Sequence, residues 1–197
     1  MIEEYRYITS CIDHALTVAG TDINGLFNRM YMVPDYMMDH SKDHLSQDMC
    51  FWKPERAAIS AADFDKYEKL TGIALPETYI MFLSYKHFVD LFFAHEASFF
   101  KHTRSWIDDN MQRICNWGRD ITLDKGLLPF ADAYDGGMYC FDSNTIYPGN
   151  EYDIVYITAA DSETPVPYAM GRFSFIQLIE EMDASLSNWY TEMTSAM

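Results

Sequence analysis

Basic residues are scarce in this sequence. Lys and Arg number 14 against 30 Asp and Glu in 197 residues, so the formal net charge is −16 and the sequence pI is about 4.5. Duplex DNA and anionic membrane surfaces repel a chain with this charge. We therefore expect neither nucleic acid nor a membrane among the direct partners of the protein.

Cysteine is also sparse, and long uncharged apolar runs are missing. The longest apolar region, residues 79–100, is interrupted by charged and histidine side chains and is too polar to span a membrane. The acidic first residues lack the basic n-region of a secretory signal. The cysteines form no C-x-x-C pair, which argues against a zinc knuckle or a disulfide framework and favours buried free thiols: Cys11, Cys50, Cys115 and Cys140. These absences predict a soluble cytoplasmic protein.

The residues that are abundant belong to a folded core. Apolar residues make up 49% of the chain and aromatic residues 16%, while only 9 Gly and 7 Pro interrupt them. This composition is typical of a globular domain and excludes a disordered acidic tail. The length suits one domain with an extension.

Helical spacing dominates residues 1–118. Apolar residues at three- and four-residue steps predict a helix over 2–20, a second short helix that ends near Met30, and a helix over 60–72 that begins with a Ser60 capping box. Pro76 in a first turn predicts a long core helix that continues to Phe92, and another helix follows over 105–118. Residues 34–54 read as a loop with some helix.

Strand-like runs replace this pattern after Gly126. Four β-prone segments are separated by short turns, which predicts an antiparallel meander, and Phe99–Phe100 is a further candidate strand. Ser174 then begins a last amphipathic helix. The predicted class is α+β, with an antiparallel sheet of about four or more strands packed with helices. We assign residues 53–197 to the main domain and residues 1–52 to an N-terminal helical extension. The four segments are 127–131, 138–142, 154–157 and 166–173.

The order of several motifs resembles the SMI1/KNR4 family of the SUKH superfamily. Residues 75–83, LPETYIMFL, are similar to that family's LP-x-x-Y-x-x-F-L helix start, and residues 127–131 and 137–142 resemble its PFA and G-x-x-(F/Y)-C-F-D strand pair. Residues 153–157 and 173–179 are similar to its next strand and closing helix. The chain departs from the family in two places: the family often has Asn-Gly after the first long helix, where Lys86-His87-Phe88 continues the helix here, and residues 1–52 have no counterpart.

The resemblance implies a SUKH-like binding module without catalytic residues. Bacterial relatives are similar to immunity proteins, which bind and neutralise a cognate polymorphic or contact-dependent toxin, often a nuclease. An acidic surface suits a partner of this kind, because a nuclease carries a basic groove for phosphates. The alternative is a regulatory module of the same fold with another protein partner. The sequence does not indicate the oligomeric state.

Candidate contacts to a partner lie on the predicted meander. Six residues fall on turns and neighbouring strand ends, where we expect the carboxylates to gather along one rim with a tyrosine as aromatic anchor. Acids and glycines also occur in turns simply because tight turns need them. The two ends of the chain hold 12 of the 16 excess negative charges, so a face built by them is a competing interface. The six residues are Asp132, Tyr134, Asp135, Asp142, Glu151 and Asp153.

An enzyme is the third alternative. Asp132, Asp135, Asp142 and Asp153 are of the type that binds a hard cation, but their spacing does not match a calcium loop. His40 and His44 have the i, i+4 spacing of a helical metal site without an evident third ligand. No nucleophile elbow, phosphate-binding loop or dinucleotide motif is present. We therefore predict no catalytic residue, no metal and no cofactor.

Overall fold

A computed structural model describes residues 2–21, 29–31, 33–42, 49–93, 97–158, 166–167 and 174–195. Its helices are α1 (Ile2–Thr21), α2 (Ala61–Thr71), α3 (Glu77–Leu83), α4 (Trp106–Trp117) and α5 (Phe175–Ser195). Short 3₁₀ turns are η1 (Asp35–Met37), η2 (Arg119–Ile121), η3 (Leu123–Lys125) and η4 (Pro148–Asn150). The strands are β1 (Arg29–Tyr31), β2 (Met49–Phe51), β3 (Glu55–Arg56), β4 (Lys86–His87), β5 (Leu91–Phe93), β6 (Ala97–Phe99), β7 (Leu127–Ala133), β8 (Met138–Tyr147), β9 (Glu151–Ile157) and β10 (Val166–Pro167).

One antiparallel sheet organises the fold. Its six strands lie in the order β10-β9-β8-β7-β6-β5, so each strand pairs with its neighbour in the chain. Two additional two-stranded pairs, β1-β2 and β3-β4, lie outside it. The predicted α+β class and the SUKH-like antiparallel sheet of at least four strands are confirmed.

The two faces of the sheet bury different clusters. Helices α1, α3 and α5 contribute to the main core, in which Phe82, Phe130, Phe141 and Phe175 are fully buried. Each such side chain contributes about 1.5–3 kcal/mol through its removal from water. The opposite face carries a smaller cluster of Leu127, Met138, Cys140, Val155 and Ile157, against which Trp117 of α4 packs. Successive side chains of one strand point to opposite faces of the sheet and therefore belong alternately to the main core and to the smaller cluster.

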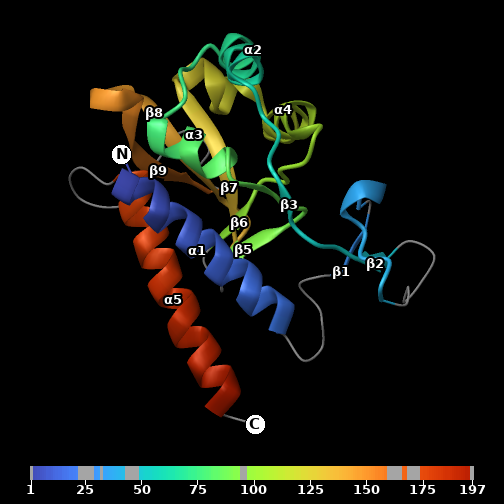
Figure 1. The fold of residues 1–197 in the computed structure, drawn as a ribbon. Coiled ribbons are helices and arrows are strands. Elements are labelled where there is room, and N and C mark those ends of the chain that lie inside the picture. The colour runs from blue at the N-terminus through green and yellow to red at the C-terminus, as the bar shows by residue number, and fades with distance from the viewer. Residues whose placement is uncertain are drawn as a thin grey trace.

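Helix α1 is part of the main core. Ile8, Ile12 and Ala15, at helical spacing, are buried in it, and α1 lies beside α5 (Figure 1). Asp13 accepts hydrogen bonds from Tyr85 Oη at 2.7 Å and from Lys86 Nζ at 2.6 Å, and His14 contacts Asp183 of α5 at 2.7 Å. Residues 2–21 thus share one core with the strands, while the boundary near residue 52 stays a prediction.

Most predicted elements appear at the expected positions. Helices α1, α2, α4 and α5 and strands β6 to β9 overlap the predicted segments, and β10 begins the predicted segment 166–173, the rest of which lies outside the described residues. The Ser60 capping box is present, with the Ser60 amide donating to Asp63 Oδ2 at 2.8 Å. Gly72 ends α2 with φ 76°, a conformation that glycine adopts without strain.

The long core helix up to Phe92 is wrong. Helix α3 ends at Leu83, β4 pairs with β3, and β5 pairs with β6 as an edge strand of the sheet. Burial in β5 alternates, because Leu91 and Phe93 face the core and Phe92 does not. Tertiary pairing therefore overrides the helical spacing of the aromatic residues. The expectation that Lys86-His87-Phe88 continues this helix is therefore wrong as well, since the chain leaves the helix before this point.

Two smaller predictions also fail. Met30 lies in β1 and not in a helix, while residues 22–28 are outside the described part of the chain. Cys115 is exposed, although Cys11, Cys50 and Cys140 are buried free thiols as predicted. Cys115 falls on the outward face of α4, because other residues occupy the buried positions of this helix. The buried residues are Trp106, Ile107, Asn110 and Ile114. The segment 34–54 contains η1 and strand β2.

Candidate functional site

A β-bulge in β7 decides where Asp132 lies. The β7–β8 register shifts between Pro129 and Ala131, and both Phe130 and Ala131 are buried in the main core. Asp132 then pairs with Met138, which belongs to the cluster on the opposite face. Bulges re-aim side chains in this way. Without the extra residue, strict alternation from Phe130 would point Asp132 into the aromatic core.

The re-aimed carboxylate belongs to a polar group of residues from the sheet and α4. Ser98 is the register partner of Asp132 on β6, and its hydroxyl donates to Asp90 Oδ1 at 2.6 Å. Arg113 of α4 grips Asp132 with two nitrogens, Nη2 to Oδ2 at 2.6 Å and Nε to Oδ1 at 3.1 Å. Two-point contacts of this kind fix the geometry as well as the charge.

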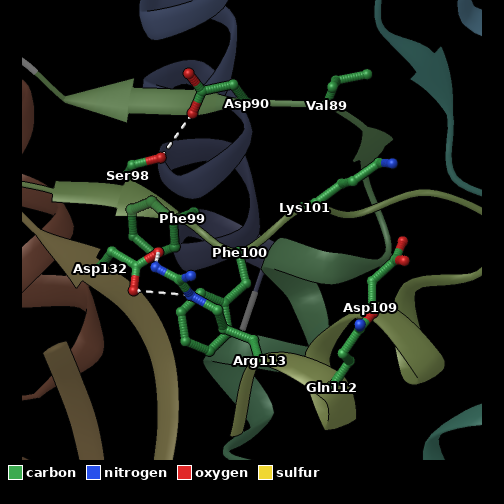
Figure 2. A pocket seen from close by; sticks show the side chains of 10 residues that line it. All are labelled: Val89, Asp90, Ser98, Phe99, Phe100, Lys101, Asp109, Gln112, Arg113 and Asp132. Carbon is green, nitrogen blue, oxygen red and sulfur yellow. Dashed lines mark hydrogen bonds and ion pairs between the residues drawn. The ribbon is translucent and has the colours of Figure 1, made fainter. Parts of the chain in front are cut away.

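A pocket of about 380 Å³ opens beside these residues, and we call it the sheet-edge pocket (Figure 2). Asp90 and Ser98 meet on one side of the view, and the Arg113–Asp132 pair lies on another. Phenylalanine rings line the wall together with charged side chains from α4 and the strand connections. The lining residues are Val89, Asp90, Ser98, Phe99, Phe100, Lys101, Asp109, Gln112, Arg113 and Asp132.

Both carboxylates of this polar group, Asp90 and Asp132, are partly removed from water. Burial raises the pKa of Asp90, the Asp132 charge raises it further, and the Ser98 hydrogen bond opposes the rise. Burial also raises the pKa of Asp132, against the effect of Arg113. Carboxylates in this setting favour hydrogen-bond donors and positive charge from a bound group. The pocket can therefore receive amide, ammonium or guanidinium groups.

The β7–β8 turn next to this pocket presents a large aromatic side chain. Tyr134 is 72% exposed, and the residue after it locks the turn. Asp135 Oδ1 accepts one hydrogen bond from Tyr156 Oη and another from the Gly137 amide at 3.2 Å. These hydrogen bonds, that from Tyr156 first, lower the pKa of Asp135, while burial and Asp135 raise the pKa of Tyr156 to about 12.

Gly137 is required for this lock. A Cβ at this position would collide with the Tyr156 hydroxyl and would lie 2.6 Å from the carbonyl oxygen of Ile157. The absence of a side chain therefore lets Tyr156 of β9 reach across to Asp135. As a result, the hydrogen bonds to Asp135 fix the backbone of the turn that carries Tyr134.

The other three predicted site residues lie at the far end of the same strands. Asp142 and Asp153 are register partners, four residues along β8 from the Asp132 pair, or roughly 14 Å. Asp142 accepts from the Asn144 side chain at 2.7 Å, and Asp153 accepts from Tyr147 Oη at 3.1 Å. The expectation that all these carboxylates gather along one rim is therefore wrong.

Glu151 has a structural partner. It is 8% exposed, and its Oε1 accepts from the Thr78 amide at 3.0 Å and from the Thr78 hydroxyl at 2.8 Å. Thr78 lies in the first turn of α3, where Pro76 at the N-cap position offers no side-chain cap. The carboxylate thus supplies the acceptor that the helix start lacks. Burial raises its pKa against these hydrogen bonds.

Sequence reasoning missed Asp90, Ser98 and Arg113. Arg113 lies 19 residues before Asp132 on a different element, so no local spacing connects them. The only available signal for Ser98 was its place between two apolar residues of β6, Ala97 and Phe99, which predicts that it lies on the opposite face of the sheet from them.

The sequence predicts no metal site, either at the aspartates of the strand turns or at His40 and His44. Among the described residues, no group of three His, Cys, Asp or Glu side chains has a geometry that would hold a metal ion. His40 is exposed, and His44 lies outside the described residues. Over the same residues, none of the helices combines the length and apolar character needed to cross a membrane.

Comparison with known families agrees with this architecture. The model of the SMI1 / KNR4 family (SUKH-1) matches residues 58–177, which is more than half of the chain. The chain belongs to the SMI1/KNR4 family. The matched region contains the sheet-edge pocket and the β7–β8 turn, whereas α1 lies outside it. Family membership is consistent with a protein-binding module, and none of the curated proteins matches the chain.

Proposed function

We propose that this SMI1/KNR4 protein is a non-enzymatic immunity protein of the cytoplasm that binds and neutralises a cognate toxin domain. The observation that carries the proposal is Tyr134, a large aromatic side chain 72% exposed on a turn that Asp135, Gly137 and Tyr156 hold in place. An aromatic residue on a preorganised loop binds a partner at low entropic cost and is typical of interface hot spots.

The net negative charge of the protein favours a positively charged partner. The net charge of −16 attracts a positively charged domain over long range and increases its association rate. Close to Tyr134, the sheet-edge pocket adds Asp90 and Asp132, whose burial favours positive groups. A nuclease toxin, whose groove binds phosphates, has this chemistry. Asp132, Tyr134 and Asp135 are the contacts we propose at this end of the sheet.

The acidic face of the two terminal helices is the competing surface. Helices α1 and α5 pack side by side (Figure 1). Glu3 and Glu4 are exposed in the first turn of α1, and Glu180 and Glu181 are exposed on α5. A regulatory module with a different protein partner would use the same fold. The two surfaces are separable, because the turn end of the sheet and the exposed side of α5 share none of these residues.

The test is to examine the gene directly upstream and, where it encodes a large secreted protein, to co-express this chain with the C-terminal domain of that protein. We expect rescue of growth and a complex whose association rate falls as salt rises. Tyr134→Ala should weaken binding at least tenfold, as expected for a hot spot. Ile146→Ala is the matched control, because Ile146 is 70% exposed at the opposite end of β8.

Three results would count against the proposal. Failure of the wild-type chain to bind or rescue would refute toxin neutralisation by this pair. Equal effects of Tyr134→Ala and Ile146→Ala would remove the turn from the interface. Loss of binding only in a Glu180→Lys, Glu181→Lys double variant would transfer the interface to α5.

A further inference from the structure

One carboxylate of the sheet-edge pocket lacks a counter-ion among the described residues. Asp90 immediately precedes β5 and is half-buried, and no Lys or Arg in the described part of the chain forms an ion pair with it. The Ser98 hydroxyl donates to its Oδ1 at 2.6 Å, but this donor is neutral. Burial raises the pKa of Asp90, and the charged group that adds to this rise is a second carboxylate, Asp132. The described residues therefore leave the negative charge uncompensated.

The two cations of the pocket are directed elsewhere. Nη2 and Nε of Arg113 both bind Asp132, at 2.6 and 3.1 Å, so the charge of this arginine is balanced and its orientation is fixed. The Lys101 amine extends to the opposite side of the view from Asp90 (Figure 2). Neither cation therefore neutralises Asp90.

The third carboxylate of the lining, Asp109, is used by the start of α4. Its Oδ2 accepts from the hydroxyls of Thr103 at 3.2 Å and Ser105 at 3.0 Å. The lining as a whole contains three carboxylates against two cations. A single further positive charge would balance it, and Asp90 is the carboxylate at which that charge is missing.

The size and the walls of the pocket suit one long side chain. Its volume of about 380 Å³ is near the lower end of the ~300–1,000 Å³ that is typical of ligand pockets. Val89, Phe99 and Phe100 are buried apolar residues of the lining. A lysine side chain packs its methylene stem along such a surface and carries its charge at the tip. The pocket thus offers an apolar wall beside an uncompensated carboxylate.

The available acceptors favour an ammonium group over a guanidinium. A guanidinium binds best when both oxygens of one carboxylate are open to its fork. Asp90 Oδ1 is already engaged by Ser98, and Arg113 occupies both oxygens of Asp132. An ammonium is a compact charge whose three donors can reach separate acceptors. Asp90 and the lone pairs of the Ser98 hydroxyl are two such acceptors.

We propose that the sheet-edge pocket receives one lysine side chain of the partner, with Asp90 as its counter-ion and as the residue that selects it. The ammonium donates to Asp90 and to the Ser98 hydroxyl, and the stem packs against Phe100. Asp132 precedes Tyr134 by two residues, so the pocket adjoins the exposed tyrosine. The proposal rests on the proposed function for the identity of the partner as a toxin domain, but the choice of lysine rests on the pocket alone.

The first test needs no toxin. ¹⁵N-labelled protein is titrated with Nα-acetyl-lysine N-methylamide at constant ionic strength, and we expect saturable shifts at the Leu91 and Ser98 amides together with a lower titration midpoint of the Asp90 carboxyl. The same compound acetylated at Nε keeps the stem and loses the charge, so it should not bind. The arginine counterpart should bind more weakly than the lysine compound, since its fork finds no open carboxylate.

Variants with opposite expected effects separate the charge of the pocket from its structure. Asp90→Asn keeps the shape of the side chain and removes its charge, and we expect lysine-probe binding to weaken about tenfold or more. Asp65→Asn is the matched control, because Asp65 is exposed on α2 and the net charge changes equally. Arg113→Gln should tighten binding, because it leaves Asp132 beside the site without its cation. General damage to the pocket would weaken binding in both pocket variants.

The second test uses the toxin domain that passes the co-expression experiment. Asp90→Asn should weaken its binding about tenfold or more, whereas Asp65→Asn should leave it unchanged. Probe binding with unaltered toxin affinity in Asp90→Asn would overturn the use of the pocket by the partner and leave toxin neutralisation standing. Failure of the wild-type chain to bind the toxin would refute the function and with it the partner's lysine, while the probe still decides the chemistry of the pocket.

The remaining outcomes of the probe titration are equally decisive. Shifts that do not saturate, or that persist unchanged in Asp90→Asn, would overturn the site whatever the toxin does. Equal or tighter binding of the arginine compound would overturn the choice of lysine. A well-dispersed spectrum shows that Asp90→Asn is folded, and Arg113→Gln provides the second measurement if it is not.

Discussion

The two ends of the β7–β8–β9 hairpins contain similar acidic residues in opposite situations. At the turn end, Asp135 is exposed and holds the backbone that presents Tyr134. At the far end, Glu151 is buried and both its oxygens accept from Thr78 of α3. One carboxylate supports a surface available to a partner, and the other closes a helix start inside the protein.

This contrast shows that the role of an acidic residue beside a turn depends on which element packs against it. Behind Asp135 lies the Tyr156 ring at the surface, whereas α3 packs directly over Glu151. The bulge in β7 adds a second lesson, because one inserted residue moves Asp132 away from the aromatic core and toward Arg113. Position along the chain does not distinguish these cases.

The largest test of the contrast is Glu151→Ala. The substitution leaves the amide and hydroxyl of Thr78 without their acceptor, and we expect a loss of about 2–3 kcal/mol in the free energy of unfolding. Urea unfolding measures it. Glu192→Ala, an exposed acid on α5, should change stability by less than about 0.5 kcal/mol. A loss no larger than that of this control would mean that Glu151 does not cap α3.

Gly137→Ala tests the other end. Its Cβ would displace Tyr156 from Asp135, and we expect about 1–2 kcal/mol of destabilisation with weaker partner binding, because Tyr134 loses its supported turn. Tyr156→Phe separates the causes, since it removes the hydrogen bond without the clash. If Gly137→Ala binds the partner as tightly as wild type, the locked turn has no role in recognition.

Local signals were sufficient for most of the fold. The Ser60 capping box, the apolar stripe of α1 and the period-two runs after Gly126 specify their elements within a few residues of sequence, and the structure follows them. The prediction for residues 84–93 was wrong because the spacing of their aromatic residues suits either a helix or an edge strand. Pairing of β4 with β3, which precedes α2 and α3 in the chain, and of β5 with the next strand, β6, decides between them.

The candidate site was harder to predict than the fold. Asp132, Tyr134 and Asp135 were recognisable as turn residues, but Arg113, Ser98 and Asp90 come from three other segments. Arg113 contacts the Asp132 side chain, Ser98 is the register partner of Asp132, and Asp90 is reached through Ser98. Glu151 and Asp135 look alike in sequence, since each stands beside a turn. Their different burial depends on α3, which no local pattern places over β9.

The smallest effect is a difference in titration between Asp135 and Glu151. Hydrogen bonds from Tyr156 and Gly137 lower the pKa of Asp135 below its ordinary 3.8, whereas burial raises the pKa of Glu151 above its ordinary 4.5. Asp135 therefore stabilises the fold while ionised. Its contribution is complete above the unfolded pKa and is lost as the pH falls through the folded value. Glu151 has the opposite sign: the part of the stability that is linked to its protonation is complete below the unfolded pKa and is lost as the pH rises through its raised value, while its oxygens accept from Thr78 in either state.

Carboxyl ¹³C titration by NMR measures both midpoints in one sample. We expect Glu151 to protonate at higher pH than Asp135, and we expect Tyr156→Phe to raise the Asp135 midpoint toward 3.8 while Glu151 stays unchanged, since Tyr156 is the main cause of the Asp135 shift and does not contact Glu151. An Asp135 midpoint that is already ordinary in the wild type would mean that the Tyr156 contact does not persist in solution. The turn would then present Tyr134 without the support on which its proposed role as an anchor depends, and the two ends of the hairpins would differ in burial alone.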